Sequence, residues 1–207
     1  MSRDAILARI RAANTTAPAT VSATPSAPPS LVSHGDGAIA RFRAAAASKG
    51  ITVVDVKGPQ MLPASVAEAL SAARIAYRAI RLNDAALAGL PWSEAGFTIS
   101  RGAATPEDAL TFSRALAAVA ETGTLMLASG VENPTTLAFL PETHLVAIDR
   151  TSILGTFEEA TALLRQTYGT TLPRTVNFIS GASRTGDIGG RIVHGAHGPR
   201  HLFVFII

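Results

Sequence analysis

The sequence contains no cysteine and has few charged or aromatic residues. Without cysteine, the chain cannot form a disulfide, use a thiolate nucleophile, or bind zinc or an iron–sulfur cluster through cysteine. Charged residues make up 16% of its 207 residues, against about 25% in typical soluble proteins. Its formal net charge of +3 permits an anionic ligand but provides no wide basic face. With only 5% aromatic residues, a nucleic-acid role is therefore improbable.

Long apolar runs are also absent. The run at residues 202–207 is too short to cross a membrane. Near the N-terminus, charged residues interrupt Ile6, Leu7 and Ile10, so no secretory signal is predicted and we expect a cytoplasmic protein. The hydrophobic content of 47% is ample for a sizeable core and excludes a fully disordered chain.

The composition divides the chain into two parts. Ser2 can cap a short helix that extends to about Ala13. Residues 14–30 carry no charge and include four prolines, which makes a helix or strand there improbable. We therefore expect a helix on a proline-rich tether over residues 1–30 and one domain over 31–207. The N-terminal helix is either a loosely docked appendage or a docking helix for another subunit.

From residue 31 onward, predicted helices alternate with predicted strands. Five helices are expected. The first is capped by Asp36 and ends at Gly50, the second starts at Pro63, and the third starts at Thr105–Asp108. The fourth spans 133–140, and the fifth follows a capping box of Thr156 and Glu159. Strands are expected at 51–56, 75–82, 97–99, 143–148, 175–180 and 201–207, with a strand–turn–strand unit over 118–127. This alternation predicts an α/β fold with a mainly parallel sheet flanked by helices.

Polar residues interrupt the apolar pattern first at Glu121, Thr122, Gly123 and Thr124. Gly123 permits a positive φ and lets a ligand approach backbone N–H groups. The two threonines add hydroxyl donors, and Glu121 is a candidate general base or carboxylate nucleophile. The alternative interpretation is a hairpin turn that carries a surface glutamate.

The second polar segment is residues 180–190. Ser180, Ser183, Arg184 and Thr185 are typical of an anion cradle, in which hydroxyls and backbone N–H groups bind the oxygens and the guanidinium supplies a fork. Asp187 either caps a helical turn or holds Arg184. The segment matches no nucleotide-binding glycine motif, and a glycine-rich connection without a ligand is the alternative.

The third segment, residues 195–199, places His197 and Gly198 beside a Gly-Pro turn. His197 is a candidate proton carrier or ligand contact near neutral pH, or a structural histidine. His194, His197 and His201 lack a nearby acidic ligand, so no metal site is predicted. His144 begins a predicted strand and is expected to be a histidine with its hydrogen bonds satisfied in the core or at its rim.

These segments occur in an order that resembles the LUD-domain family, and within it the lactate utilisation proteins. The resemblance covers residues 36–207 and rests on 120–124, Leu140-Pro141 with His144, 180–188 and 195–199. It implies a fold like that of ribose-5-phosphate isomerases and CoA-transferases, with ligand loops at strand ends. It also implies a three-component system that oxidises L-lactate to pyruvate, in which partner subunits carry the iron–sulfur clusters and this chain carries no cofactor.

Three functions remain open at this point. In the first, the chain is a subunit of the lactate-oxidising complex: Arg184, Ser183 and Thr185 hold a carboxylate, and Glu121 or His197 accepts the hydroxyl proton. In the second, it is a stand-alone enzyme of the isomerase or CoA-transferase kind. In the third, it is a non-catalytic ligand-binding or scaffold protein. The candidate catalytic residues are Glu121 and His197, and the candidate ligand-binding residues are Thr122, Gly123, Thr124, Ser180, Ser183, Arg184, Thr185, Asp187 and Gly198.

Overall fold

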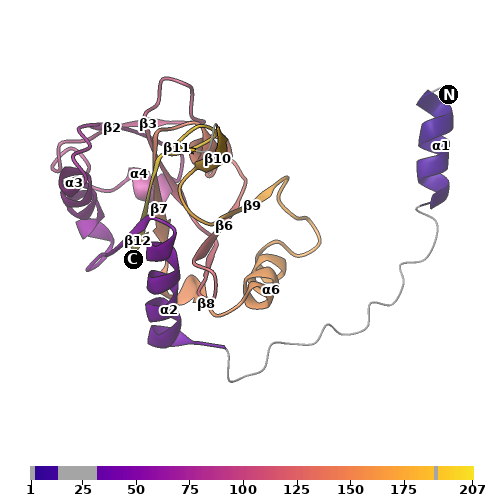
Figure 1. Ribbon diagram of the computed structural model, residues 1–207, viewed down its shortest axis with the longest axis horizontal. Coiled ribbons are helices and arrows are strands. Elements are labelled where there is room, and N and C mark those ends of the chain that lie inside the picture. The colour runs from indigo at the N-terminus through magenta and orange to yellow at the C-terminus, as the bar shows by residue number, and fades with distance from the viewer. Residues whose placement is uncertain (1–2, 14–31, 189–190) are drawn as a thin grey trace.

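The computed structural model describes residues 3–13, 32–188 and 191–207 (Figure 1). The side chains of residues 187, 188, 191 and 192 lie outside this description. So do the predicted cap Ser2 and the predicted tether at residues 14–30. The first described element is helix α1, Arg3–Ala13, as the sequence predicts.

A six-stranded sheet, parallel throughout, forms the centre of the domain. Its strands, in spatial order, are β1 (Ile51–Asp55), β12 (His201–Ile206), β7 (Thr143–Ile148), β4 (Leu110–Arg114), β2 (Ala79–Leu82) and β3 (Thr98–Arg101). Thr143 pairs with both His201 and Leu110, so the amino ends of β12, β7 and β4 lie level with one another. The prediction of an α/β fold with a mainly parallel sheet is confirmed.

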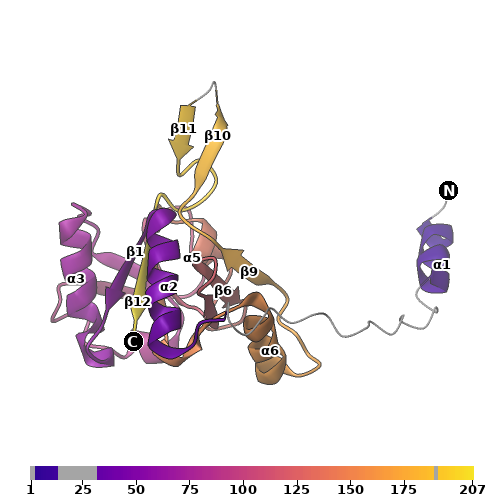
Figure 2. The ribbon, with the colours of Figure 1, turned by 60° about the horizontal axis from the view of Figure 1, so that its bottom comes forward.

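A second sheet of four strands lies beside the first and has the order β8 (Ile153–Leu154), β5 (Ala117–Val119), β6 (Thr124–Ala128), β9 (Val176–Ile179). Strands β5 and β6 pair antiparallel, which confirms the predicted strand–turn–strand unit. The glycines and serines of segment 180–190 predicted a loop, but part of the segment forms a strand. Its middle forms β10 (Arg184–Ile188), which pairs with β11 (Arg191–His194) in a hairpin that projects from the sheets (Figure 2). A Gly-Gly pair with Ile188 before it and Arg191-Ile192-Val193 after it is a hairpin signal, so this hairpin could have been predicted from the sequence.

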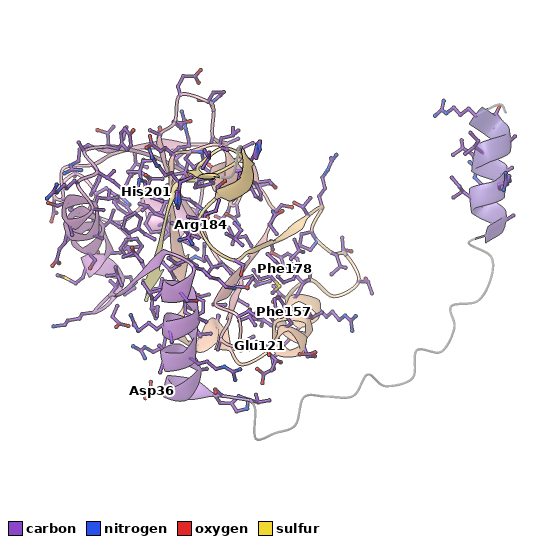
Figure 3. The ribbon with its side chains drawn as sticks, in the orientation of Figure 1. Asp36, Glu121, Phe157, Phe178, Arg184 and His201 are labelled. Atoms are coloured by element: carbon purple, nitrogen blue, oxygen red, sulfur yellow. The ribbon has the colours of Figure 1, made fainter. Side chains whose placement is uncertain are left out.

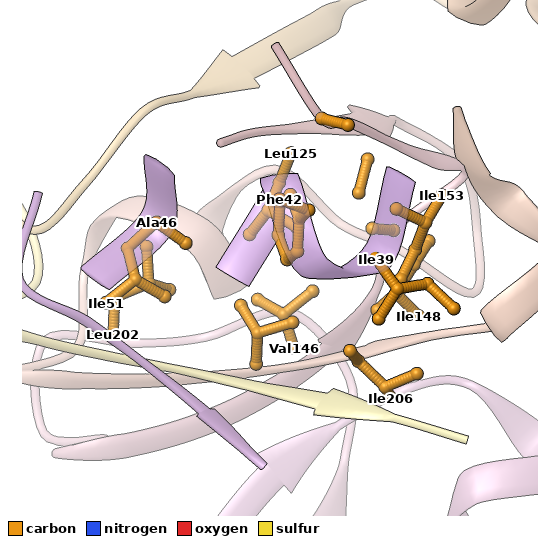
Figure 4. Packing of buried hydrophobic residues seen from close by; sticks show 14 of the residues in the cluster. Ile39, Phe42, Ala46, Ile51, Leu125, Val146, Ile148, Ile153, Leu202 and Ile206 are labelled. Atoms are coloured by element: carbon orange, nitrogen blue, oxygen red, sulfur yellow. The ribbon is translucent and has the colours of Figure 1, made fainter. Parts of the chain in front are cut away.

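Helix α2 (Gly35–Ser48) packs between the two sheets. Phe42 is fully buried and joins a core that includes Val146 from the six-stranded sheet and Leu125 from the four-stranded sheet (Figure 4). Burying a phenylalanine side chain contributes about 1.5–3 kcal/mol. The predicted cap at Asp36 is wrong: the N-cap is His34, without a side-chain bond, and Asp36 instead accepts a hydrogen bond from Arg150 at 3.3 Å.

Other helices cover the outer faces of the sheets. Helix α3 (Leu62–Ala72), with the turn η2 (Pro59–Met61), lies across β1 and β12 from α2 (Figure 2). Helix α6 (Phe157–Tyr168) covers the four-stranded sheet and begins with the predicted capping box. The remaining short elements are α4 (Ala85–Ala88), α5 (Thr136–Phe139) and η3 (Arg150–Ser152). Across residues 3–13, 32–188 and 191–207, no helix has the length and apolarity needed to span a bilayer.

The helix predicted to start at Thr105–Asp108 does not form. These residues make a turn in which the Asp108 carboxylate accepts hydrogen bonds from Thr105 N at 2.8 Å and from Arg81 Nε at 3.0 Å. Strand β4 begins two residues later, and Leu110 and Phe112 are fully buried. Pairing with β7 at the centre of the sheet therefore outweighs the local helix-start pattern.

We expect Gly123→Ala to destabilise the fold more than Gly96→Ala. Both glycines have a positive φ, 63° and 78°, where an L-residue costs about 1–2 kcal/mol. A Cβ on Gly96 would meet nothing within 4 Å, whereas one on Gly123 would lie 2.5 Å from the Ala46 nitrogen in α2. Overpacking of this kind adds about 1–3 kcal/mol. Urea unfolding of both variants measures the difference, and equal losses would contradict the tight contact between this turn and α2.

Candidate functional site

A cavity of about 280 Å³ lies where the second and third polar segments meet the six-stranded sheet. Its walls come from α5, β7, β9, β12 and two loops, with the lining residues Ala138, Phe139, His144, Phe178, Ile179, Ser180, Gly181, Ala182, Ser183, His197, Gly198, Pro199 and Leu202. His144 and Leu202 are the second residues of β7 and β12. The cavity thus lies at the amino ends of these strands, whereas ligands of open parallel sheets usually bind beyond the carboxyl ends.

Backbone hydrogen bonds join the second and third segments side by side. Ser183 N donates to Pro199 O at 2.8 Å, and Gly195 N donates to Ser183 O at 3.0 Å. His197 N donates to Ser183 Oγ at 3.4 Å. Ser183, His197 and Gly198 are therefore neighbours in one wall of the cavity, although fourteen residues separate Ser183 from His197.

The first segment lies behind this wall and contacts Ser180. Thr124 is 3% exposed, and its Oγ1 lies 2.9 Å from Ser180 Oγ. Thr122 Oγ1 donates to Thr124 Oγ1 at 2.8 Å, while Gly123 packs on the backbone of α2. Thr122, Gly123 and Thr124 thus support Ser180 and do not line the cavity.

Lys49, at the C-cap of α2, belongs to the site but was not predicted from the sequence. Its Nζ donates hydrogen bonds to Thr122 O and to Ser180 Oγ. An ammonium therefore lies one hydrogen bond from the cavity wall. Because Ser180 accepts from Lys49, its own proton is directed to Thr124 or into the cavity. A lysine at a helix C-terminus is normally interpreted as a residue that caps the helix. The sequence therefore gave no signal of the hydrogen bond from Lys49 to Ser180.

Two predicted residues lie outside the cavity wall. Glu121 Oε1 accepts a hydrogen bond from Phe157 N at 3.2 Å, at the start of α6. Arg184 packs over Gly50, beyond the end of α2. Figure 3 shows Glu121 beside Phe157 and well separated from Arg184. The structure therefore does not bring Glu121, Arg184 and His197 together around one ligand.

The other predicted residues of the second segment belong to the hairpin. Thr185 pairs with Val193 in the β10–β11 ladder and does not line the cavity. The side chain of Asp187 lies outside the described residues. Within the described part of the chain, no three His, Asp or Glu side chains are grouped as metal ligands.

His144 is the buried polar group of the site. It is 0% exposed, and its Nε2 lies 2.6 Å from Ser113 Oγ on β4. Its Nδ1 has no hydrogen-bond partner among the described residues, so the expected fully satisfied core histidine is only half satisfied. Burial lowers the pKa of His144 from its ordinary value of 6.5 to about 3, so the imidazole is neutral at physiological pH. In the sequence, the signal for this buried polar group was a histidine in a strand that is otherwise apolar apart from Thr143.

Two partly exposed aromatic side chains line the cavity, and a second hollow adjoins it. Phe139 and Phe178 are 42% and 49% exposed, and the Phe178 ring packs on that of Phe157 with centroids 5.5 Å apart. The outer hollow, of about 810 Å³, shares Phe139, His197 and Gly198 with the cavity. Apart from its two histidines, the inner wall built by the described residues is uncharged. Largely apolar walls with a few convergent polar groups are typical of small-ligand sites.

Comparison with known proteins places these features in a family. Residues 106–207 match the model of the LUD domain, and this range holds all three polar segments and His144. The chain is 38% identical to an uncharacterized protein of Neisseria meningitidis over 96 residues, 46% of this chain and 41% of that protein. It is 35% identical to lactate utilization protein C of Geobacillus thermodenitrificans over 91 residues, 43% of this chain and 38% of that protein.

A third curated relative gives the same picture. Lactate utilization protein C of Bacillus subtilis is 34% identical over 83 residues, which are 39% of this chain and 35% of that protein. The matches thus span about two fifths of the length of these relatives. A crystal structure of a DUF162 family protein from Deinococcus radiodurans has the same fold, with a TM-score of 0.58 and 24% identity over 82% of this chain and 95% of that one.

We expect the stability of the protein to fall at acid pH because of His144. Between pH 6.5 and about 3, the unfolded chain binds a proton at this histidine that the folded chain does not. The free energy of unfolding therefore decreases as the pH falls, by about 1.4 kcal/mol per pH unit. Urea unfolding from pH 7 to pH 5 should show this slope in the difference between the wild type and His144→Phe.

Thr143→Val is the matched control, because it removes a buried hydroxyl without a partner in the described structure on the opposite face of β7. This variant should keep the pH dependence of the wild type. Parallel pH profiles for the wild type and His144→Phe would contradict a buried neutral imidazole.

Proposed function

Since the chain belongs to the LUD-domain family, we propose that it is a subunit of a lactate utilisation system and binds a small carboxylate in the cavity beside His144. The relatives that carry the name lactate utilization protein C support the system. The observation that carries the ligand site is the cavity itself, since the second and third segments form its wall and the first holds Ser180 in place.

Hydroxyls and backbone amides are the proposed carboxylate ligands. Ser180 and Ser183 line the cavity together with Gly181 and Ala182. The ammonium of Lys49 bonds directly to Ser180, and its positive charge favours an anion at the adjacent wall. Arg184 does not line this wall, so these groups take the place of the guanidinium that was predicted to bind the carboxylate.

The volume is sufficient for a three-carbon acid. At about 280 Å³, the cavity exceeds the volume of several water molecules, which occupy about 30 Å³ each in the liquid. Phe139, Phe178 and Leu202 provide apolar contacts for the carbon chain. His197 is the proposed acceptor of the hydroxyl proton, because it lines the same wall as Ser183.

Oxidation of L-lactate to pyruvate breaks the O–H bond, whose proton His197 takes, and the C–H bond at the second carbon. We propose that this second hydrogen and its two electrons pass, as a hydride equivalent, to an acceptor in a partner subunit. A cysteine-free sequence cannot hold a cluster ligated by cysteine, so we place the iron–sulfur clusters in partner subunits. A stand-alone isomerase or CoA-transferase reaction has less support, since Glu121 accepts a bond from the start of α6 and does not line the cavity.

The partner part of the proposal is tested by anaerobic purification of the tagged chain from its own host. We expect iron-bearing proteins to co-elute, and the eluate to reduce an artificial electron acceptor when L-lactate is added. An iron-free eluate without lactate-dependent reduction, from a host whose growth on lactate does not need this gene, would contradict the proposal.

The ligand part is tested by Ser183→Ala in the same eluate. Losing one hydrogen bond to a charged group costs about 1.5–3 kcal/mol, so we expect the KM for L-lactate to rise about tenfold or more. Ser48→Ala is the control, because Ser48 is exposed, its hydroxyl donates to Ala45 O within its own helix, and it does not line the cavity. Thermal unfolding of both variants checks the fold, and an unchanged KM for a folded Ser183→Ala protein would exclude this carboxylate site.

A further inference from the structure

We infer that His144, positioned by Ser113, recognises an oxygen atom on the carbon next to the ligand's carboxylate, and that the pair accepts this oxygen both as a hydroxyl and as a carbonyl. This inference rests on the proposed function and adds to it the residue that distinguishes 2-hydroxy and 2-oxo acids from acids without that oxygen. His144 is suited to this role because it is completely buried, lies in the cavity wall, and has a ring nitrogen without a partner in the described parts of the chain.

The position of His144 leaves its second nitrogen for a ligand. Ser113, which bonds Nε2, belongs to β4 on one side of β7. On the other side, Leu202 of β12 pairs with His144 and lines the same cavity. Burying a polar nitrogen without a partner costs about 1–3 kcal/mol, which a ligand with a suitably placed oxygen would recover.

The serine hydroxyl makes the pair adaptable. A neutral imidazole has one nitrogen that donates and one that accepts, and a serine hydroxyl can do either. When Ser113 donates to Nε2, Nδ1 carries the proton and can donate to a ketone oxygen. When Nε2 donates to Ser113, Nδ1 accepts and can bind an alcohol proton. One pair therefore matches both the substrate and the product of an alcohol-to-ketone oxidation.

The low pKa of the imidazole supports this assignment. At neutral pH, His144 stays uncharged, so its preference among ligands depends on hydrogen bonding and not on its own charge. The carboxylate is common to all the acids considered, and Ser180, Ser183 and Lys49 act on each of them alike. Discrimination by His144 is thus separable from carboxylate binding.

The test compares propionate, L-lactate and pyruvate binding to the purified full-length chain by isothermal titration calorimetry. These acids share the carboxylate and the three-carbon chain and differ in the oxygen at the second carbon. A site whose buried polar group is left unpaired discriminates strongly, so we expect lactate and pyruvate to bind at least about tenfold more tightly than propionate.

His144→Phe should bring all three acids to the affinity of propionate, and Thr143→Val should keep the wild-type preference. Ser113→Ala should reduce the preference for the oxygen-bearing acids without weakening propionate, and Ser113→Thr should restore it, because the hydroxyl returns. Far-UV circular dichroism and thermal unfolding confirm that each variant folds. If His144→Phe does not fold, the two Ser113 variants decide the question.

The failures of the two proposals are distinguishable. If the wild type binds none of the three acids, the carboxylate site of the proposed function is overturned, and this inference with it. If it binds all three with equal affinity, the carboxylate site stands and the role of His144 is overturned. A preference that survives in folded His144→Phe protein would likewise overturn it.

Discussion

The carboxyl end of α2 is the point on which the arrangement of the two sheets depends. The turn at Gly123 packs directly on the α2 backbone at Ala45 and Ala46, where no side chain fits. One residue beyond the helix, Lys49 bonds to both the β5–β6 turn and the loop after β9. Without this junction, Ser180 would lose its hydrogen bond to Lys49, and the β5–β6 turn that carries its other partner, Thr124, would lose its contact with α2. Packing between the sheets and support of the cavity wall thus meet at the carboxyl end of α2.

The same junction explains how a chain with few charges forms a polar site. The ammonium of Lys49 donates a hydrogen bond to Ser180. The hydroxyls of Thr122 and Thr124 continue this hydrogen-bonded chain behind the wall. On the neighbouring strands β4 and β7, Ser113 and His144 form a buried polar pair inside a largely apolar core. Such a pair is neutral and directional, so in the proposed site it would distinguish ligands by hydrogen bonding and not by charge.

Most of the fold could be predicted from sequence, because apolar runs and caps act locally. The strand at 143–148 and the capping box at Thr156 were predicted at the positions where they occur. The predicted helix at Thr105 failed, because pairing with β7 is a long-range effect that a local pattern does not contain. For the candidate site, the sequence predicted which segments take part but not which of their residues line the cavity. Which residues line the cavity depends on packing, which places His144 in the wall and Arg184 outside it.

The most direct test of this account is nitrogen-15 NMR of the histidine rings, with His144 assigned through His144→Phe. The account predicts that His144 remains neutral at pH 5, well above its folded-state pKa of about 3, and that its Nδ1 resonance shifts when L-lactate or pyruvate is added but not with propionate. A His144 that titrates near pH 6.5, or whose Nδ1 resonance ignores all three acids, would contradict a ligand cavity built around a buried neutral histidine.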